Sequence, residues 1–220
     1  MKLSVSQLKT YNASPAKWAG LYILWIEEKF PNDAFALWHL AESYLITKQD
    51  NYQLLEWQDI QDREKLIEEY DNIKHNAEWL EVPKGINQHK VEWLLFDQSF
   101  VGYIDILTDD CVYDIKTTRY LTDPSKDGVN MWSNLSSYDE YALQLWVYMK
   151  LTGIKKAKIL EVAKHKYKDE RNANQILEFD LTDEFDKKMI AKRKPIVQEM
   201  VTLYNRHKWY VSTDQELKNN

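Results

Sequence analysis

The sequence has little of several residue types from which specialised sites are built. It holds one cysteine, Cys111, among 220 residues, which excludes an internal disulfide framework and a four-cysteine zinc site. Glycine and proline number only five each, which argues against a glycine-rich nucleotide-binding loop. No apolar run approaches the ~20 residues that a membrane-spanning helix needs, and residues 1–7 are too polar for a signal peptide. We therefore expect a cytoplasmic protein with no membrane contact.

Charge is distributed unevenly along the chain. Residues 48–82 carry ten acidic and four basic side chains, so their net charge equals the −6 of the whole sequence. Two later stretches, 155–171 and 187–194, are rich in lysine and arginine. Net acidity therefore does not exclude a polyanionic partner, because binding depends on the local patch. The alternative is that these charges are the solvated faces of a strand and a helix.

The spacing of apolar residues changes along the chain and predicts the order of the elements. The first ~85 residues have helical spacing, with Ser14 and Pro15 as the cap and first turn of one helix. A later helix should begin near Ser137 and end at Gly153, and a last one begins at Thr182. The predicted strands cover residues 90–96, 100–107, 111–117, 158–165 and 175–181.

This order predicts a protein of the α/β (α+β) class with a mixed β-sheet of about five strands flanked by helices. The first three strands are joined by short polar gaps that suit antiparallel pairing, whereas the two strands that flank a crossover helix should be parallel. We expect a single domain. Its parts are a helical N-terminal part (1–88), a sheet and helix core (89–182) and a C-terminal helix with a tail (183–220).

Two acidic side chains fall on neighbouring predicted strands. On the strand predicted over residues 111–117, Asp114 and Lys116 point to one face and Tyr113 and Ile115 to the other, because side chains alternate along a strand. If the two strands form a hairpin, Asp105 lies beside Asp114, and the carboxylates repel unless a cation lies between them. Mg²⁺ or Mn²⁺ suits oxygen ligands, and Lys116 could then orient a water or a phosphate oxygen. The alternative is a surface ion pair.

Two further features lie on predicted helices. Tyr141, Gln144 and Tyr148 recur at helical spacing and place an amide and two phenols on one face of an otherwise apolar helix. His39 lies outside the main apolar stripe of its own helix and shares its side with Phe35 and Glu42. The alternatives are a helix with one wetted side and a hydrogen-bonded structural histidine.

The ordered set His39, Gly102-x-x-Asp105, Asp114-x-Lys116 and Gln144-x-x-x-Tyr148 resembles the PD-(D/E)XK nucleases. Within them it is most similar to the RecB-type branch, which includes many small phage exonucleases. Ile104 stands where the family name has proline, a replacement that the family tolerates. The resemblance implies a restriction-endonuclease-like core built around the predicted sheet.

The resemblance also implies a role for each of these residues. Asp105 and Asp114 would hold one or two Mg²⁺ or Mn²⁺ ions, with His39 and the Ile115 carbonyl as further ligands. Lys116 would be the catalytic lysine, and Gln144 and Tyr148 would complete the catalytic set. No iron–sulfur cluster is expected, because the cysteines that hold one in some relatives are absent. Candidate DNA-binding residues are Arg119 and Lys126, just after the catalytic strand, and Tyr141.

The expected function is that of a metal-dependent DNA nuclease, and within that class an exonuclease acting in recombination, repair or replication. DNA, single- or double-stranded, is the expected partner, and phage biology is one setting that fits. A recombinase, a single-strand-binding protein or a helicase would be a separate chain, and a homo-oligomer stays open. One alternative is a catalytically silent nucleic-acid-binding or assembly module on the same fold. The other is an unrelated α/β protein with accidental matches.

Overall fold

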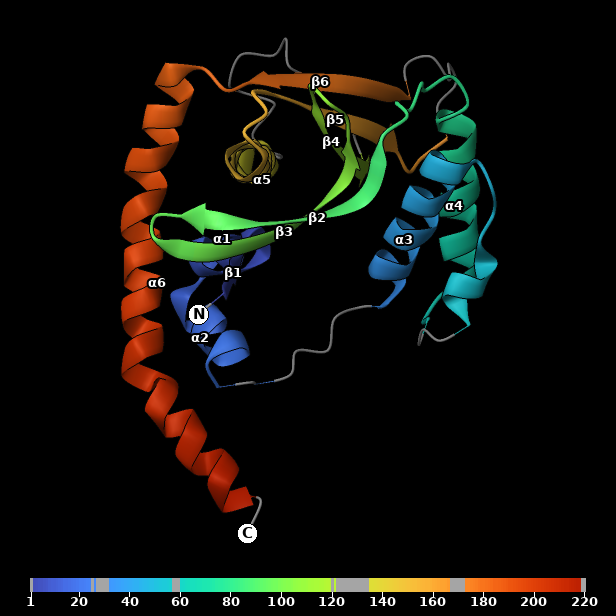
Figure 1. The fold of residues 1–220 in the computed structure, drawn as a ribbon. Helices are drawn as coiled ribbons and strands as arrows, with labels where there is room; N and C mark the ends of the chain where they lie inside the picture. Colours follow the sequence, from blue (N-terminus) through green and yellow to red (C-terminus); the bar gives the residue numbers. More distant parts are fainter. Residues whose placement is uncertain are drawn as a thin grey trace.

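A mixed β-sheet forms the centre of the molecule (Figure 1). The computed structural model describes residues 2–24, 26, 32–56, 60–119, 121, 135–166 and 173–218. Within these ranges the sheet has six strands, in the order β1-β3-β4-β5-β6, with β2 paired to β3. The strands are β1 (Lys2–Ser4), β2 (Ile86–Leu95), β3 (Gln98–Leu107), β4 (Val112–Thr118), β5 (Lys156–Ala163) and β6 (Asn174–Asp180).

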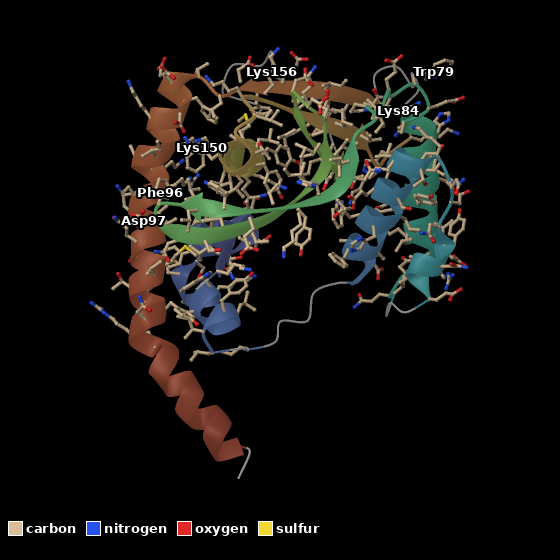
Figure 2. All side chains as sticks on the ribbon, in the orientation of Figure 1. Trp79, Lys84, Phe96, Asp97, Lys150 and Lys156 are labelled. Atoms are coloured by element: carbon tan, nitrogen blue, oxygen red, sulfur yellow. The ribbon has the colours of Figure 1, made fainter. Side chains whose placement is uncertain are left out.

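The strand directions match the prediction of a mixed sheet. Strands β2 and β3 form a long antiparallel hairpin, whose turn residues Phe96 and Asp97 are labelled at its tip in Figure 2. Their positive φ angles, 54° and 60°, are typical of the two-residue turns that suit twisted hairpins. Strands β4 and β5, joined through a helix, are parallel, as the crossover rule predicts.

Six α-helices are described, and short polar residues begin several of them. Ser4 Oγ accepts a hydrogen bond from the backbone N–H of Gln7, and Ser14 Oγ does the same for Lys17; each caps an exposed helix start. Gly153, with a φ of 77°, follows the last residue of α5. The helices are α1 (Val5–Ala13), α2 (Pro15–Tyr22), α3 (Asn32–Thr47), α4 (Arg63–Asn76), α5 (Leu135–Thr152) and α6 (Asp183–Lys218), with a 3-10 turn at Tyr52–Leu55.

Apolar side chains form a core on each side of the sheet. One core contains buried residues of α1, α2, α5 and α6, with Trp18 and Trp146 among its largest side chains. The other joins α3 and α4 to strands β4 and β5 around Tyr70 and Ile115. Figure 1 shows α3 and α4 side by side, well separated from α6. None of the helices in the described ranges is both long and apolar enough to cross a membrane.

The structure differs from the sequence prediction in two places. A sixth strand, β1, adds to the expected five; it has three residues, too few to show a period in the sequence. The helical spacing expected to extend to about residue 85 ends earlier, because the last helix of this part is α4 (Arg63–Asn76). Helix α4 begins after Asp62, whose side chain caps Lys65 N–H at 3.0 Å. It ends at Asn76, whose buried side-chain amide donates to the carbonyls of Ala163 and His165.

Candidate active site

The site begins where strands β3 and β4 separate. Their register pairs Ile106 with Tyr113 and Leu107 with Val112, and no pair beyond these two is formed. At the next position Asp105 Oδ2 accepts the backbone N–H of Ile115 at 2.7 Å. A buried N–H needs an acceptor, and here a carboxylate supplies it in place of the neighbouring strand. Asp105 is therefore fixed against β4, beside Asp114.

Strand β4 supplies a carboxylate and an ammonium group on one face. Lys116 Nζ lies 2.5 Å from Asp114 Oδ2, as the alternation of side chains along a strand predicts. The same Nζ is 3.5 Å from the Ile115 carbonyl oxygen. Asp114 is 1% exposed and Asp105 is 5% exposed, so both carboxylates lie in a poorly solvated place. The surface ion pair considered from the sequence is thereby excluded.

Helix α5 fixes the second oxygen of Asp114. Gln144 Nε2 donates to Asp114 Oδ1 at 2.7 Å and also to Tyr148 Oη at 3.2 Å. Asp114 is thus held from two sides, by Lys116 and by Gln144. Tyr141 lies one turn earlier on α5 and is partly buried; burial, with the charges of Glu161 and Asp114 nearby, raises its pKa.

Glycine at position 102 allows this helix to approach the sheet. A Cβ atom there would lie 2.6 Å from Cε1 of Tyr148, closer than carbon atoms can pack. The ring of Tyr148 therefore lies directly over the backbone of β3. In the Gly102-x-x-Asp105 pattern, the glycine leaves room for the Tyr148 ring, and the aspartate three residues later supplies the carboxylate.

Two charged residues that the sequence analysis assigned no role also lie at the site. Lys9 of α1 donates from Nζ to Gln144 Oε1 at 2.9 Å, so Gln144 connects Lys9 to Asp114. Glu42 of α3 is 4% exposed and contacts Gln88. The available signal for Glu42 was its place three residues after His39, on the same side of α3. No local pattern marks Lys9, which reaches Gln144 from far along the chain.

The positive charge near the carboxylates of this site does not offset their burial and mutual repulsion. Burial and the neighbouring Asp114 raise the pKa of Asp105 to about 8. Burial and Asp114 raise the pKa of Glu42 to about 7. Burial opposes the charge on Lys116, but the attraction of Asp114 and Asp105 prevails, and the pKa of Lys116 is raised. Burial and the charge of Lys116 lower the pKa of Lys9.

A cavity of about 290 Å³ lies at this site. Its lining includes Asp105, Asp114, Lys116, Gln144 and Tyr148, which come from β3, β4 and α5. The structure therefore brings five of the predicted site residues together at one hollow. The rest of the lining is Ser4, Val5, Ser6, Trp38, Gln88, Val101, Gly102 and Tyr103.

The other predicted site residues lie elsewhere. The ring of His39 contacts Phe35 and Trp38, with centroids 4.2 Å and 4.6 Å away, and His39 is not part of the cavity lining. Burial lowers the pKa of His39. Arg119 lies just beyond β4, where its Nε donates to Nε2 of His165 at 3.2 Å. Lys126 lies outside the described residues.

The donor atoms fit a hard divalent cation. Asp105, Asp114 and the Ile115 carbonyl offer only oxygen, which Mg²⁺ and Mn²⁺ prefer. In the described part of the chain, no three His, Cys, Asp or Glu side chains are grouped as a metal site. Two carboxylates are nevertheless the usual protein share for Mg²⁺, which otherwise keeps waters and binds substrate phosphates. The residues therefore fit an ion that is completed by water and substrate.

Comparison with known proteins identifies the fold. The structure is similar to that of a provisionally named exonuclease from Eubacterium rectale, with a TM-score of 0.61, 16% identity and coverage of 94% of this chain and 82% of that one. An alkaline exonuclease from Laribacter hongkongensis gives a TM-score of 0.47 at 13% identity, covering 96% and 94%. A phage-related exonuclease from Haemophilus somnus gives 0.44 at 14%, covering 97% and 96%.

The first of these likenesses establishes a shared fold over nearly the whole chain. It confirms the predicted fold class, a mixed sheet flanked by helices with a restriction-endonuclease-like core. No protein-family model matches the sequence, and no curated protein sequence matches it.

Proposed function

We propose that the protein is a Mg²⁺- or Mn²⁺-dependent deoxyribonuclease that removes nucleotides from DNA ends. The observation that carries this proposal is the convergence of Asp105, Asp114 and Lys116 on one cavity, from two strands that separate there. The shared fold with a provisionally named exonuclease supports it. The proposal makes the protein a phosphodiester hydrolase whose substrate is single- or double-stranded DNA.

In this proposal Asp105, Asp114 and the Ile115 carbonyl would hold the cation. Glu42 is a further carboxylate within the electrostatic reach of both aspartates. A bound Mg²⁺ or Mn²⁺ supplies a more acidic water and screens the charge of the phosphate. Because Asp105 already accepts the Ile115 N–H, its orientation is set before any ion or substrate binds.

Lys116 is the residue best placed to act on the reacting phosphate. Its Nζ contacts Asp114 and the Ile115 carbonyl, and its raised pKa keeps it protonated. A fixed ammonium in a dry site stabilises negative charge that develops on phosphate oxygens. Lys9 supplies a second ammonium close by. Gln144, which also donates to Tyr148, holds Asp114 in its orientation.

The assay that tests this function compares end-labelled linear DNA with closed circular DNA, each single- and double-stranded. We expect degradation of linear DNA with Mg²⁺ or Mn²⁺, none with EDTA, and survival of closed circles. Asp114→Ala and Lys116→Ala should each abolish degradation. Asp97→Asn, at the exposed tip of the β2–β3 hairpin, tolerates the positive φ of this turn position; it is the matched control and should behave as wild type.

Other outcomes would reject the proposal in distinct ways. Full activity in purified Asp114→Ala protein would remove the site from the reaction. DNA binding without degradation under every metal condition would favour the silent binding module. We also propose partners for the nuclease. They are a recombinase, a single-strand-binding protein or a helicase on another chain, and a second copy of this chain. Co-purification tests each of them.

A further inference from the structure

A second cavity lies at the carboxyl ends of the parallel strands β4 and β5. Its volume is about 450 Å³, and we call it the β4–β5 groove. Helix α4 forms its other wall. The groove is lined by Lys65, Thr117, Thr118, Arg119, Lys164 and His165, together with Glu69.

The groove is basic although the chain is acidic. Among the described residues that line it, Lys65, Arg119 and Lys164 face a single carboxylate, Glu69, whereas the whole chain has a net charge of −6. The hydroxyls of Thr117 and Thr118 add neutral hydrogen-bond donors. Lysine, arginine and hydroxyl side chains are the groups that contact phosphate oxygens in nucleic-acid complexes.

Hydrogen bonds fix the backbone that forms the floor of the groove. The backbone N–H of Lys164 donates to the Thr118 carbonyl at 2.8 Å. The buried side-chain amide of Asn76 donates to the carbonyls of Ala163 and His165, at 2.8 Å and 2.6 Å. Arg119 donates to His165 across the two strand ends. The backbone from which Arg119 and Lys164 extend is therefore fixed, which lowers the entropic cost of binding a ligand.

The groove continues from the candidate active site. Lys116 lines the catalytic cavity, and the next two residues, Thr117 and Thr118, line the groove. Because side chains alternate on a strand, Thr118 shares the face of Lys116, and Thr117 lies on the other face. At about 3.3 Å per residue, the groove begins within about 7 Å of Lys116 along the strand. It therefore passes round the end of β4.

The far end of the groove has the opposite charge. The neighbouring cavity shares Lys65, Glu69 and Lys164 but is otherwise lined by residues that include Asp33 and Asp62. A polyanion held at the two lysines is repelled from that side. The charge pattern therefore directs a bound strand towards Thr118 and the active site.

We propose that the β4–β5 groove binds the phosphate backbone of single-stranded DNA that continues from the phosphodiester at Lys116. This inference rests on the proposed nuclease function, because it uses that function to set where the strand is cut. A cavity of this size holds groups the size of a small ligand, which suits a few nucleotides of one strand. Arg119 and the lysines contact phosphates, which makes the binding independent of base sequence.

The test measures binding of a fluorescent 20-residue oligothymidine in EDTA, over a series of NaCl concentrations. Lys65→Ala/Lys164→Ala should weaken binding at least 10-fold. For single strands each lost phosphate contact lowers the slope of log K against log salt by about 0.7, so the slope should fall by about 1.4. The control, Lys187→Ala/Lys188→Ala on the exposed face of α6, removes the same charge and should leave both values unchanged.

Glu69→Gln is the variant with the opposite expected sign. It removes the carboxylate of Glu69 from the groove lining, so oligothymidine should bind more tightly than to wild type. The proposed DNA site would be wrong if both double-lysine variants lost the same affinity for oligothymidine. It would also be wrong if Glu69→Gln did not bind oligothymidine more tightly. Tighter binding of oligouridine than of oligothymidine would overturn the assignment to DNA.

A small chromogenic diester, thymidine 5′-(p-nitrophenyl phosphate), separates this inference from the proposed function. It carries one phosphate and no continuing strand, so the groove variants should lower its hydrolysis with Mn²⁺ far less than they lower the degradation of DNA. If wild type hydrolyses neither this diester nor DNA, the proposed function fails. The binding measurements in EDTA still decide whether the groove holds single-stranded DNA.

Discussion

The carboxylate of Asp105 accepts the backbone N–H of Ile115 at a distance of 2.7 Å. This single contact stands in for a strand-to-strand hydrogen bond at the point where β3 and β4 part. Where the strand pairing ends, the two carboxylates and the Lys116 ammonium group therefore lie close together. The separation of the two strands leaves room for a cavity between β3, β4 and α5.

Gly102→Ala should damage the site through Tyr148. The new Cβ would lie 2.6 Å from the Tyr148 ring, so the ring and Gln144 beside it must move. We expect a loss of about 1–3 kcal/mol in the free energy of unfolding and a larger loss of nuclease activity. Gly20→Ala in α2 is the matched control, because its Cβ meets nothing closer than 3.6 Å. Equal activity in the two variants would contradict the packing described for Tyr148.

The stability of the metal-free protein should fall as the pH rises. Asp105 has a folded-state pKa of about 8, above the ~3.9 of an unfolded aspartate, so the folded state binds the proton more tightly. Its contribution is full below pH 4 and is lost as the pH rises towards 8. Asp105→Asn keeps the acceptor for Ile115 and should be more stable than wild type at pH 8 in EDTA, by about 1–3 kcal/mol.

Urea unfolding at pH 5 and pH 8 measures this difference, with Asp97→Asn at the hairpin tip as the control. At pH 5 both variants should have nearly the same free energy of unfolding as wild type. At pH 8 the value for Asp105→Asn should exceed that of wild type, whereas the value for Asp97→Asn should not. An Asp105→Asn protein that is less stable than wild type at pH 8 would show that the carboxylate is not strained by its surroundings.

Glu42 and His39 make different predictions for metal affinity. Glu42 shares the electrostatic field of both aspartates, whereas the ring of His39 contacts Phe35 and Trp38. We expect Glu42→Gln to weaken Mn²⁺ binding about 10-fold, within the range for groups that support a metal site. His39→Ala should weaken it less. The reverse order, measured by calorimetry, would support His39 as the ligand that the family resemblance implies.

Lys9 should matter for turnover of the small diester. Its Nζ donates to Gln144 at the edge of the cavity, where a second ammonium attracts a phosphate. Lys9→Met should lower kcat/KM for thymidine 5′-(p-nitrophenyl phosphate) about 10–100-fold, the scale of losing an outer group that supports the site residues. Lys188→Met on α6 should leave kcat/KM unchanged. An unaltered value in Lys9→Met would limit Lys9 to a packing role.

The parts of the site that sequence predicts are those set by local geometry. Asp114 and Lys116 share a face because a strand alternates, and Asp105 joins them because a short turn makes a hairpin. Gln144 and Tyr148 follow from helical spacing on α5. Each of these relationships depends on a few neighbouring residues or on one turn, so the pattern of residue types is enough.

The parts that sequence did not predict depend on tertiary packing. Lys9 reaches Gln144 across 135 positions of the chain, and no periodic pattern records that contact. Glu42 is buried because α3 packs against β4, which a helical wheel does not show. Strand β1 is short and forms only through its pairing with β3. The end of α4 depends on Asn76, which binds the distant end of β5.

Calorimetric titration with Mn²⁺ tests the central claim most directly. Wild type should bind the ion at pH 8, and both Asp105→Ala and Asp114→Ala should lose at least 100-fold in affinity, while Asp97→Asn binds as wild type does. Undiminished Mn²⁺ binding in both cavity variants would show that the two carboxylates share no cation and would contradict the account.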